Sequence, residues 1–480
     1  NNTNKYKCHL STTFIQEVYG EIKLDIQRAN SLNKVDLIIK NADIATVNKS
    51  NEIINNASIV IDQTKIIYIG KNSSQYKAKR VLDVAGAFVH PGFIDNHIHL
   101  NYHSLRWLSK DGADWNEALP IHNKYMGIAD YESEYMSSML AMLEMVKNGT
   151  TAFLESGGII NTDAAAEAAI DIGIRTFLGD AFVRDQDSNG VPVTRKDKDR
   201  VYALLGTELA RNKNENDLVQ SVVTLSGMGK ASDELLLKAK ELADTHGVIL
   251  NMHQSYQEDD YLEDNNRLGM PPMVHYDNIG LLDSNCTFSH VNRINDVEVL
   301  PILDSKLSIA WCPMASMLFG VGGTIKGKHL ELFKDGVNIS FGCDSANWTS
   351  AFDIGEQAFI ALLTAREKTG DPSALTAEEI LRISTINGSK ALGKESDFGS
   401  LEVGKRADLV IRKNTLPESL PGFDPVREVM VSSRSKSVDT VIINGDIVVE
   451  KGNATTIDED EFASKFKVFH KKLVRKLEDA

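Results

Sequence analysis

Three histidines follow an apolar run near residue 100, at a spacing that could bind a metal. His97, His99 and His103 fall within seven positions of "PGFIDNHIHLNYH". The chain has 12 histidines in 480 residues, so a chance His-x-His is expected about 0.3 times and the motif alone is weak evidence. Residues two apart on a strand point to the same side, so His97 and His99 would project together. A metal site requires further ligands elsewhere in the chain.

Three such candidates end other apolar, strand-like runs. His253 ends "VILNMH", His290 ends "CTFSH" and Asp344 ends "SFGCD". Several imidazoles with one carboxylate form a donor set typical of one Zn²⁺, with Fe²⁺ and Mn²⁺ as alternatives. Such a metal lowers the pKa of bound water towards about 7 and supplies hydroxide at neutral pH. Asp344 can then shuttle the proton to the leaving group, and His290 can stabilise the oxygen of a tetrahedral intermediate.

These residues meet only if the fold brings the ends of distant strands together. Continuous apolar strands are buried on both faces, as in a parallel sheet covered by helices. Eight such units over about 300 residues suit a (β/α)₈ TIM barrel, in which all strands end at one face. Segments with a helical sequence pattern separate most of the eight runs. The runs span residues 87–99, 150–156, 174–183, 219–227, 248–255, 286–292, 307–313 and 337–345.

Short β-rich segments bracket this α/β middle. The sequence pattern of short strands and turns extends from residue 35 to about residue 90. The same pattern occurs again near the other end of the chain, where Asn444-Gly445 indicates a tight turn. We expect a composite β-sandwich domain formed by both chain ends. The predicted division is an N-terminal extension (1–34), the first part of the sandwich (35–90), the barrel (91–397), the second part of the sandwich (398–457) and a C-terminal helix (458–480).

The composition limits the partners. The chain has 67 Asp and Glu and 52 Lys and Arg, which gives a net charge of −15. This charge argues against a surface that binds nucleic acids or anionic membranes. No apolar stretch reaches the ~18 residues of a membrane span. Cys286, Cys312 and Cys343 lie in apolar runs and are expected to be buried, reduced thiols. We expect a cytoplasmic protein that acts on a small-molecule substrate as a homodimer or higher homo-oligomer.

Several motifs carry a resemblance to a known family. They are "PGFIDNHIH", the single histidine of Met252-His253, "SHVNRI", "CPMAS", "GCDSAN" and "GSLEVGKRADLVI", and they lie between about residues 35 and 452. On these motifs the chain resembles the amidohydrolase superfamily, in the branch of chlorohydrolases, aminohydrolases and deaminases. The resemblance implies a (β/α)₈ barrel enzyme that hydrolyses carbon–nitrogen bonds other than peptide bonds.

The resemblance also implies roles for the strand-end residues. It implies a mononuclear site with His97, His99, His253 and Asp344 as metal ligands. His290 is then expected to orient the water or polarise the substrate. Binuclear members use a carboxylated lysine to bridge two metals, but we expect Lys230 to be a cation that faces substrate or solvent. Further candidates for lining the pocket, or for packing near it, are Glu155, Arg184, Trp311, Asn347 and Trp348.

Two departures bear on the substrate. Deaminating relatives carry a glutamate three residues after the fifth-strand histidine, where this chain has Tyr256. Glu258, Asp259 or Asp260 would replace it only if the loop shifts. The text "TLSGMGKAS" also lacks the fourth-strand histidine of substrate-binding deaminases. Both absences favour hydrolysis of an amide, urea or carbamate bond by metal-bound hydroxide, with Tyr256 orienting the substrate.

Two other readings stay open. A deaminase or chlorohydrolase of a heteroaromatic ring shares the metal site but needs an acid near Tyr256. A catalytically silent scaffold that kept the barrel for assembly should have lost metal ligands. All five strand-end residues are present, which disfavours the scaffold.

Overall fold

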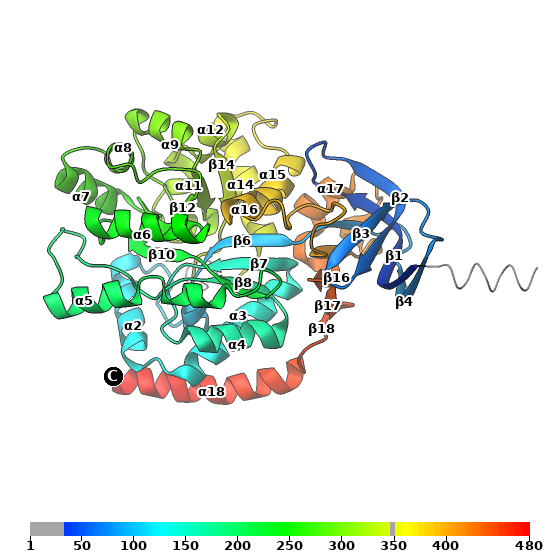
Figure 1. Cartoon of the computed structure of the whole chain (residues 1–480), viewed down its shortest axis with the longest axis horizontal. Helices are drawn as coiled ribbons and strands as arrows, with labels where there is room; N and C mark the ends of the chain where they lie inside the picture. Colours follow the sequence, from blue (N-terminus) through cyan, green and yellow to red (C-terminus); the bar gives the residue numbers. More distant parts are fainter. Residues whose placement is uncertain (1–32, 346–350) are drawn as a thin grey trace, which may run out of the picture.

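The computed structural model describes residues 33–345 and 351–480, except for the side chains of residues 115 and 116. The predicted pocket residues Asn347 and Trp348 lie outside the described residues, as do positions 1–32 of the predicted N-terminal extension. Figure 1 shows a strand-and-helix barrel with a smaller β-rich region beside it, formed by segments from both ends of the chain.

Parallel strands form the predicted barrel. β9 and β10 are two halves of the fourth strand: β9 pairs with β8, and β10 pairs with β11. A bridge between Ile98 and Asp344 joins the last strand to the first and closes the ring. The (β/α)₈ architecture is thus confirmed. The strands are β6 (Phe93–Ile98), β7 (Thr150–Glu155), β8 (Arg175–Leu178), β9 (Val219–Ser221), β10 (Val223–Gly227), β11 (Leu250–Gln254), β12 (Cys286–His290), β13 (Ser308–Trp311) and β14 (Asn338–Phe341).

Helices with local start and stop signals surround the strands. In α6, the side chain of Ser232 accepts a hydrogen bond from the Leu235 N–H, and Gly247 ends the helix in the left-handed region at φ 63°. The described α-helices are α2 (Trp115–Ile128), α3 (Tyr131–Lys147), α4 (Thr162–Ile172), α5 (Arg195–Leu204), α6 (Asp233–His246), α7 (Glu258–Leu268), α8 (Pro272–Asn278), α9 (Val299–Ser305), α10 (Pro313–Leu318), α11 (Gly323–Lys326), α12 (His329–Lys334), α14 (Ile354–Thr369), α15 (Ala377–Ser384), α16 (Ile386–Ala391), α17 (Pro425–Arg427) and α18 (Glu459–Asp479).

In the part of the chain that the structure describes, segments from both ends build one nine-stranded sheet. β15 pairs with β5 in an antiparallel register, which links the C-terminal strands to the N-terminal ones. Ile39 and Ile59 share a buried hydrophobic cluster with Leu409 and Ile442, so the composite β-sandwich is confirmed. We propose residues 35–90 and 398–457 as its two parts. The strands are β1 (Asn33–Ala45), β2 (Ile53–Asp62), β3 (Lys65–Gly70), β4 (Tyr76–Asp83), β5 (Phe88–Pro91), β15 (Leu409–Arg412), β16 (Val438–Ile443), β17 (Asp446–Glu450) and β18 (Asn453–Ala454).

The prediction that the apolar run at 87–99 forms one barrel strand is wrong. The run forms β5 in the end sheet and β6 in the barrel, separated at Gly92. A Cβ on Gly92 would lie only 2.0 Å from Oγ1 of Thr151, so the chain passes too close to β7 for any side chain. Hydrophobicity alone does not reveal such a change of sheet, because both strands are buried.

Residues near the C-terminus form the helix α18, which begins at Glu459. The side chain of Asp458 accepts a hydrogen bond from the N–H of Glu461 and caps α18. The helix runs along the barrel beside α2 (Figure 1). Across residues 33–345 and 351–480, no helix combines the length and apolar character that crossing a membrane requires.

Candidate active site

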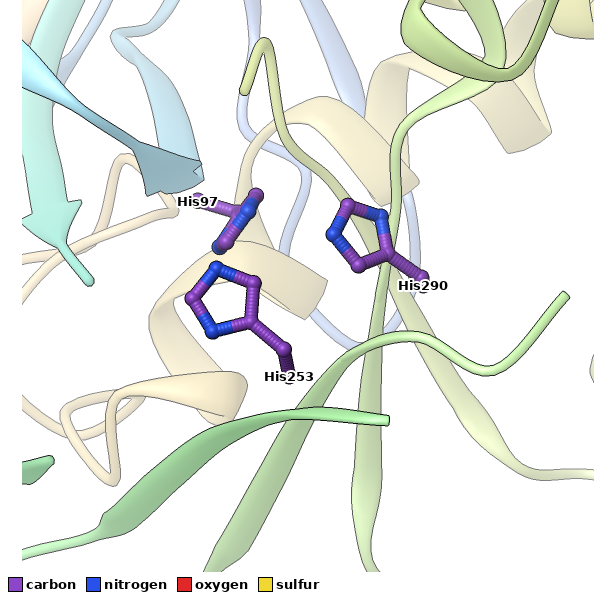
Figure 2. A group of neighbouring side chains, drawn as sticks. All are labelled: His97, His253 and His290. Carbon is purple, nitrogen blue, oxygen red and sulfur yellow. The ribbon is translucent and has the colours of Figure 1, made fainter. Parts of the chain in front are cut away.

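The ends of four barrel strands bring the five predicted residues together. His97 and His99 come from β6 and its end, His253 from β11 and His290 from β12, and Asp344 follows β14. Oδ1 of Asp344 lies 3.8 Å from Nε2 of His97 and 3.9 Å from Nε2 of His99. Nε2 of His290 lies 3.9 Å from Oδ2 of the same carboxylate. The rings of His97, His253 and His290 point towards one another in Figure 2.

Barrel closure itself positions these groups. The N–H of Asp344 donates to the carbonyl of His97 at 2.7 Å, and the N–H of His99 donates to the carbonyl of Asp344 at 3.3 Å. His290 and Asp344 both have positive φ angles, 72° and 66°, which residues other than glycine seldom adopt. Backbone conformations of this kind persist where the surrounding structure holds them, often at functional sites.

Hydrogen bonds orient two of the imidazoles. Nδ1 of His97 lies 2.7 Å from the hydroxyl of Ser156. Nδ1–H of His253 donates to the carbonyl of Ser226 at 3.0 Å. A carbonyl only accepts, so the hydrogen of His253 is on Nδ1 and the lone pair is on Nε2. That lone pair lies 3.0 Å from Nε2 of His99.

The cluster fits a divalent cation. Among the described residues, Nε2 of His97 and Oδ1 of Asp344 are buried and have no hydrogen-bond partner. Burial holds the pKa values of His97 and His99 well below the usual range and lowers that of His253 to about 4, so these rings are neutral and each has a lone pair available to a cation. Two imidazole nitrogens 3.0 Å apart suit neighbouring ligands with metal–nitrogen bonds of about 2.0–2.1 Å.

Two buried carboxyl groups have different roles beside this cluster. Burial raises the pKa of Asp344 to about 7. Glu155, whose pKa burial raises to about 8, accepts hydrogen bonds from the N–H groups of Gly157 and Gly158 at 2.8 and 2.9 Å. Its Oε1 lies 4.0 Å from Nδ1 of His99, so Glu155 orders the loop after β7 beside that imidazole and does not line the cavity.

A cavity of about 320 Å³ lies against the cluster, within the size range of ligand pockets. Of the predicted pocket residues, Arg184, Lys230 and Tyr256 line it. Trp311 does not line it and instead stacks on His329, with ring centroids 4.9 Å apart. Nε2–H of His329 donates to the carbonyl of His290 at 2.6 Å, so Trp311 supports the backbone of the site.

The acids near Tyr256 are used elsewhere. The carboxylate of Asp260 accepts hydrogen bonds from the N–H groups of Tyr256 and Gln257 at 2.9 and 2.7 Å, at the start of α7. Glu258 pairs with Arg293 at 2.8 Å. Asp344 is the only carboxylate among the described residues that line the cavity.

One wall of the cavity was not predicted from the sequence. Tyr102 comes from the short helix η1 (Leu100–Leu105), and His122, Asn123 and Met126 come from α2. The long interval between His99 and the helix at Asp130 was the one available signal, because an active-site barrel loop of such length often covers the pocket.

The far end of the chain supports this wall. Leu473 and Leu477 of α18 share a buried cluster with Tyr102. Nε2–H of His470 donates to the carbonyl of Ser104 at 2.9 Å, and Nζ of Lys124 donates to the carbonyl of Leu477 at 3.2 Å. Helix α18 therefore holds η1 and α2 against the barrel.

Comparisons with known proteins agree with this geometry. The chain is 27% identical over 454 residues to a 5-methylthioadenosine/S-adenosylhomocysteine deaminase of Moorella thermoacetica, covering 91% of this chain and 99% of the relative. Its fold is similar to that of a zinc-bound adenosine deaminase from Xanthomonas campestris, with a TM-score of 0.84, 20% identity and coverage of 92% and 99%. A zinc complex of an atrazine chlorohydrolase from Arthrobacter aurescens matches with a TM-score of 0.82, 20% identity and coverage of 90% and 100%.

The model of the "Amidohydrolase family" matches residues 88–448, well over half of the chain. This range includes every barrel strand and all five clustered residues. The chain therefore belongs to the amidohydrolase family and is a metal-dependent hydrolase of carbon–nitrogen bonds other than peptide bonds.

Proposed function

We propose that the protein deaminates an amino-substituted heteroaromatic ring, with adenine nucleosides as the substrate class and zinc as the metal. The cavity is the observation that carries the proposal. Tyr102 and Phe182 supply aromatic rings, and Met126 and Met228 supply thioethers, to the lining of a space that also holds the metal-ligand cluster. Such flat, apolar walls suit a planar ring. The relative that is a deaminase and the zinc in similar structures support the assignment.

Cleavage of an amide, urea or carbamate is the second candidate. It is favoured by one observation, the absence of a carboxylate beside Tyr256 among the described cavity residues. A ring deaminase without that carboxylate must move its protons through another group. Among the described residues that line the cavity, Asp344 is the acid that could transfer these protons.

Each side chain has a role in the proposed reaction. His97, His99, His253 and Asp344 would hold the metal, which when bound supplies the Lewis acidity that activates water. The carboxylate of Asp344, the one acid among the described cavity residues, would take a proton from the water and deliver it to the departing amine. The neutral ring of His290 carries one N–H that stabilises the oxygen added to the ring carbon.

Ammonia release tests the proposal directly. Zinc-loaded protein is incubated with adenosine and 5-methylthioadenosine, with a chlorotriazine, and with a panel of amides, ureas and carbamates. We expect ammonia and an ultraviolet absorbance change from the adenine nucleosides. Turnover of the acyclic compounds alone would establish the second candidate, and chloride release alone would establish a chlorohydrolase. A fully metal-loaded protein that turns over none of them would fit the scaffold.

The proposed setting is the cytoplasm, with the protein as a homodimer or higher homo-oligomer. Cys286, Cys312 and Cys343 are free and buried, which suits a reducing compartment. Size-exclusion chromatography with light scattering tests the oligomeric state, and a monomer at micromolar concentration would contradict it.

A further inference from the structure

Two cationic side chains share one part of the cavity wall. Lys230 follows β10 and Arg184 follows β8, and both line the cavity together with His253 and Asp344. The loops that carry the two cations are joined: the N–H groups of Asp185 and Gln186 donate to the carbonyl of Lys230 at 3.2 and 3.4 Å. Burial lowers the pKa of Lys230, and the nearby guanidinium of Arg184 lowers it further. The arrangement places two like charges beside a metal centre.

Two carboxylates that flank the loops of these cations have hydrogen-bond partners of their own. Asp185 accepts hydrogen bonds from the N–H and the hydroxyl of Ser232, at 2.8 and 2.5 Å, where α6 begins. Asp264 accepts one from Arg267 at 2.8 Å.

Asp260 likewise accepts hydrogen bonds at the start of α7. Asp260 and Glu263 raise the pKa of Lys230, but by less than burial and Arg184 lower it. Across residues 33–345 and 351–480, no ion pair joins a carboxylate to Lys230 or Arg184. Lys230 is half-buried and Arg184 is exposed, so the lack of a paired anion is unfavourable for Lys230 until a ligand supplies one.

We propose that Lys230 and Arg184 form a subsite for an oxyanion on the substrate, a carboxylate or a phosphate remote from the reacting ring. Guanidinium and ammonium groups bind such oxygens through charge-assisted hydrogen bonds, and the guanidinium can bind two oxygens at once. The subsite makes the enzyme selective for anionic substrates over neutral ones of the same ring. It deepens the proposed function, on which the identity of the ring depends.

The kinetic test compares three substrates that share the adenine ring. Adenosine is neutral outside the ring, adenosine 5′-monophosphate carries a phosphate, and S-adenosylhomocysteine carries a carboxylate. We expect the zinc-loaded protein to show a kcat/KM at least about tenfold higher for one anionic substrate than for adenosine. Which of the two is preferred distinguishes the phosphate from the carboxylate.

Substitution then assigns the effect to the subsite. Lys230→Met keeps the length of the side chain and removes its charge. It should lower kcat/KM for the preferred anionic substrate on the order of tenfold to hundredfold, and for adenosine by less than about threefold. Lys238→Met is the matched control, since Lys238 is an exposed lysine on α6 that pairs with Glu241. An equal loss for neutral and anionic substrates in Lys230→Met would overturn the subsite.

A binding measurement separates the subsite from the proposed reaction. Metal-loaded Lys230→Met and Lys238→Met are titrated calorimetrically with inorganic phosphate and with acetate. Weaker binding of either anion by Lys230→Met supports the subsite even if no adenine compound is deaminated, an outcome that would refute only the proposed function. Equal affinity of both variants for both anions refutes the subsite even if deamination is found.

Discussion

The cavity has a floor and a wall that differ in how the chain builds them. The floor is the cluster of His97, His99, His253, His290 and Asp344, all at strand ends of a closed barrel, and all of them except His97 line the cavity. The wall comes from η1, α2 and the loops after β8 and β10, which are segments between the strands.

This difference suggests that the floor carries out the reaction and that the wall selects the substrate. The floor is held by barrel closure and by hydrogen bonds to buried groups, so its geometry depends on the core of the protein. The wall depends partly on α18, more than 300 residues away in the chain. Damage to the floor should therefore abolish turnover, whereas damage to the wall should weaken substrate binding.

The largest effect is expected from removal of a floor ligand. His97→Ala and His99→Ala should each lose most of the bound metal and all measurable activity, while the large apolar core keeps the barrel folded. Metal analysis together with circular dichroism checks this. His246→Ala, at the exposed end of α6, is the matched control and should keep its metal. Unchanged metal content in both floor variants would refute the metal assignment.

Loss of the proton shuttle should be the next largest effect. Asp344→Asn should lower kcat/KM by about 10²–10⁴, the range typical of a lost acid–base group. Tyr256→Phe should cost on the order of tenfold, as expected for one hydrogen bond. Glu258→Gln should cost little, because Glu258 pairs with Arg293. If steady-state kinetics find Glu258→Gln as inactive as Asp344→Asn, the proton passes through the loop after β11 instead.

A change in the wall should affect binding and spare the metal. Phe182→Ala removes an aromatic face of the cavity, so KM should rise on the order of tenfold while kcat stays within about threefold. Metal content should equal that of the wild type. Phe423→Ala is the control, because Phe423 is 92% exposed and does not line the cavity. A fall in kcat with no change in KM would place Phe182 with the floor.

The smallest effect is expected from the support of the wall. Leu473→Ala opens the cluster that joins α18 to Tyr102, so hydrogen exchange of residues 100–128 should become faster and KM should rise a few-fold, by about two- to fivefold. Val468→Ala is the control on the same helix, since Val468 is largely exposed. Unchanged exchange in Leu473→Ala would show that η1 and α2 hold their position without α18.

The sequence predicted the residues of the floor better than those of the wall. Strand ends could be read from apolar runs that stop at His253, His290 and Asp344, because burial on both faces leaves a continuous apolar pattern. Helix starts depend on caps such as Ser232 and Asp458, which act on neighbouring backbone groups and so leave a local signal in the sequence. The division of the run at Gly92 could not be read, because it depends on the approach of Thr151 from another strand.

The sequence by itself determined the barrel, the composite end domain and the five strand-end residues that cluster, because these depend on local periodicity and on one rule of barrel topology. Only the tertiary structure decided which other side chains reach the cavity. It excluded Glu155 and Trp311, which form hydrogen bonds or stack behind the site, and it brought in Tyr102 from a wall held by α18. Those positions depend on contacts between distant segments, which residue types and spacing do not encode locally.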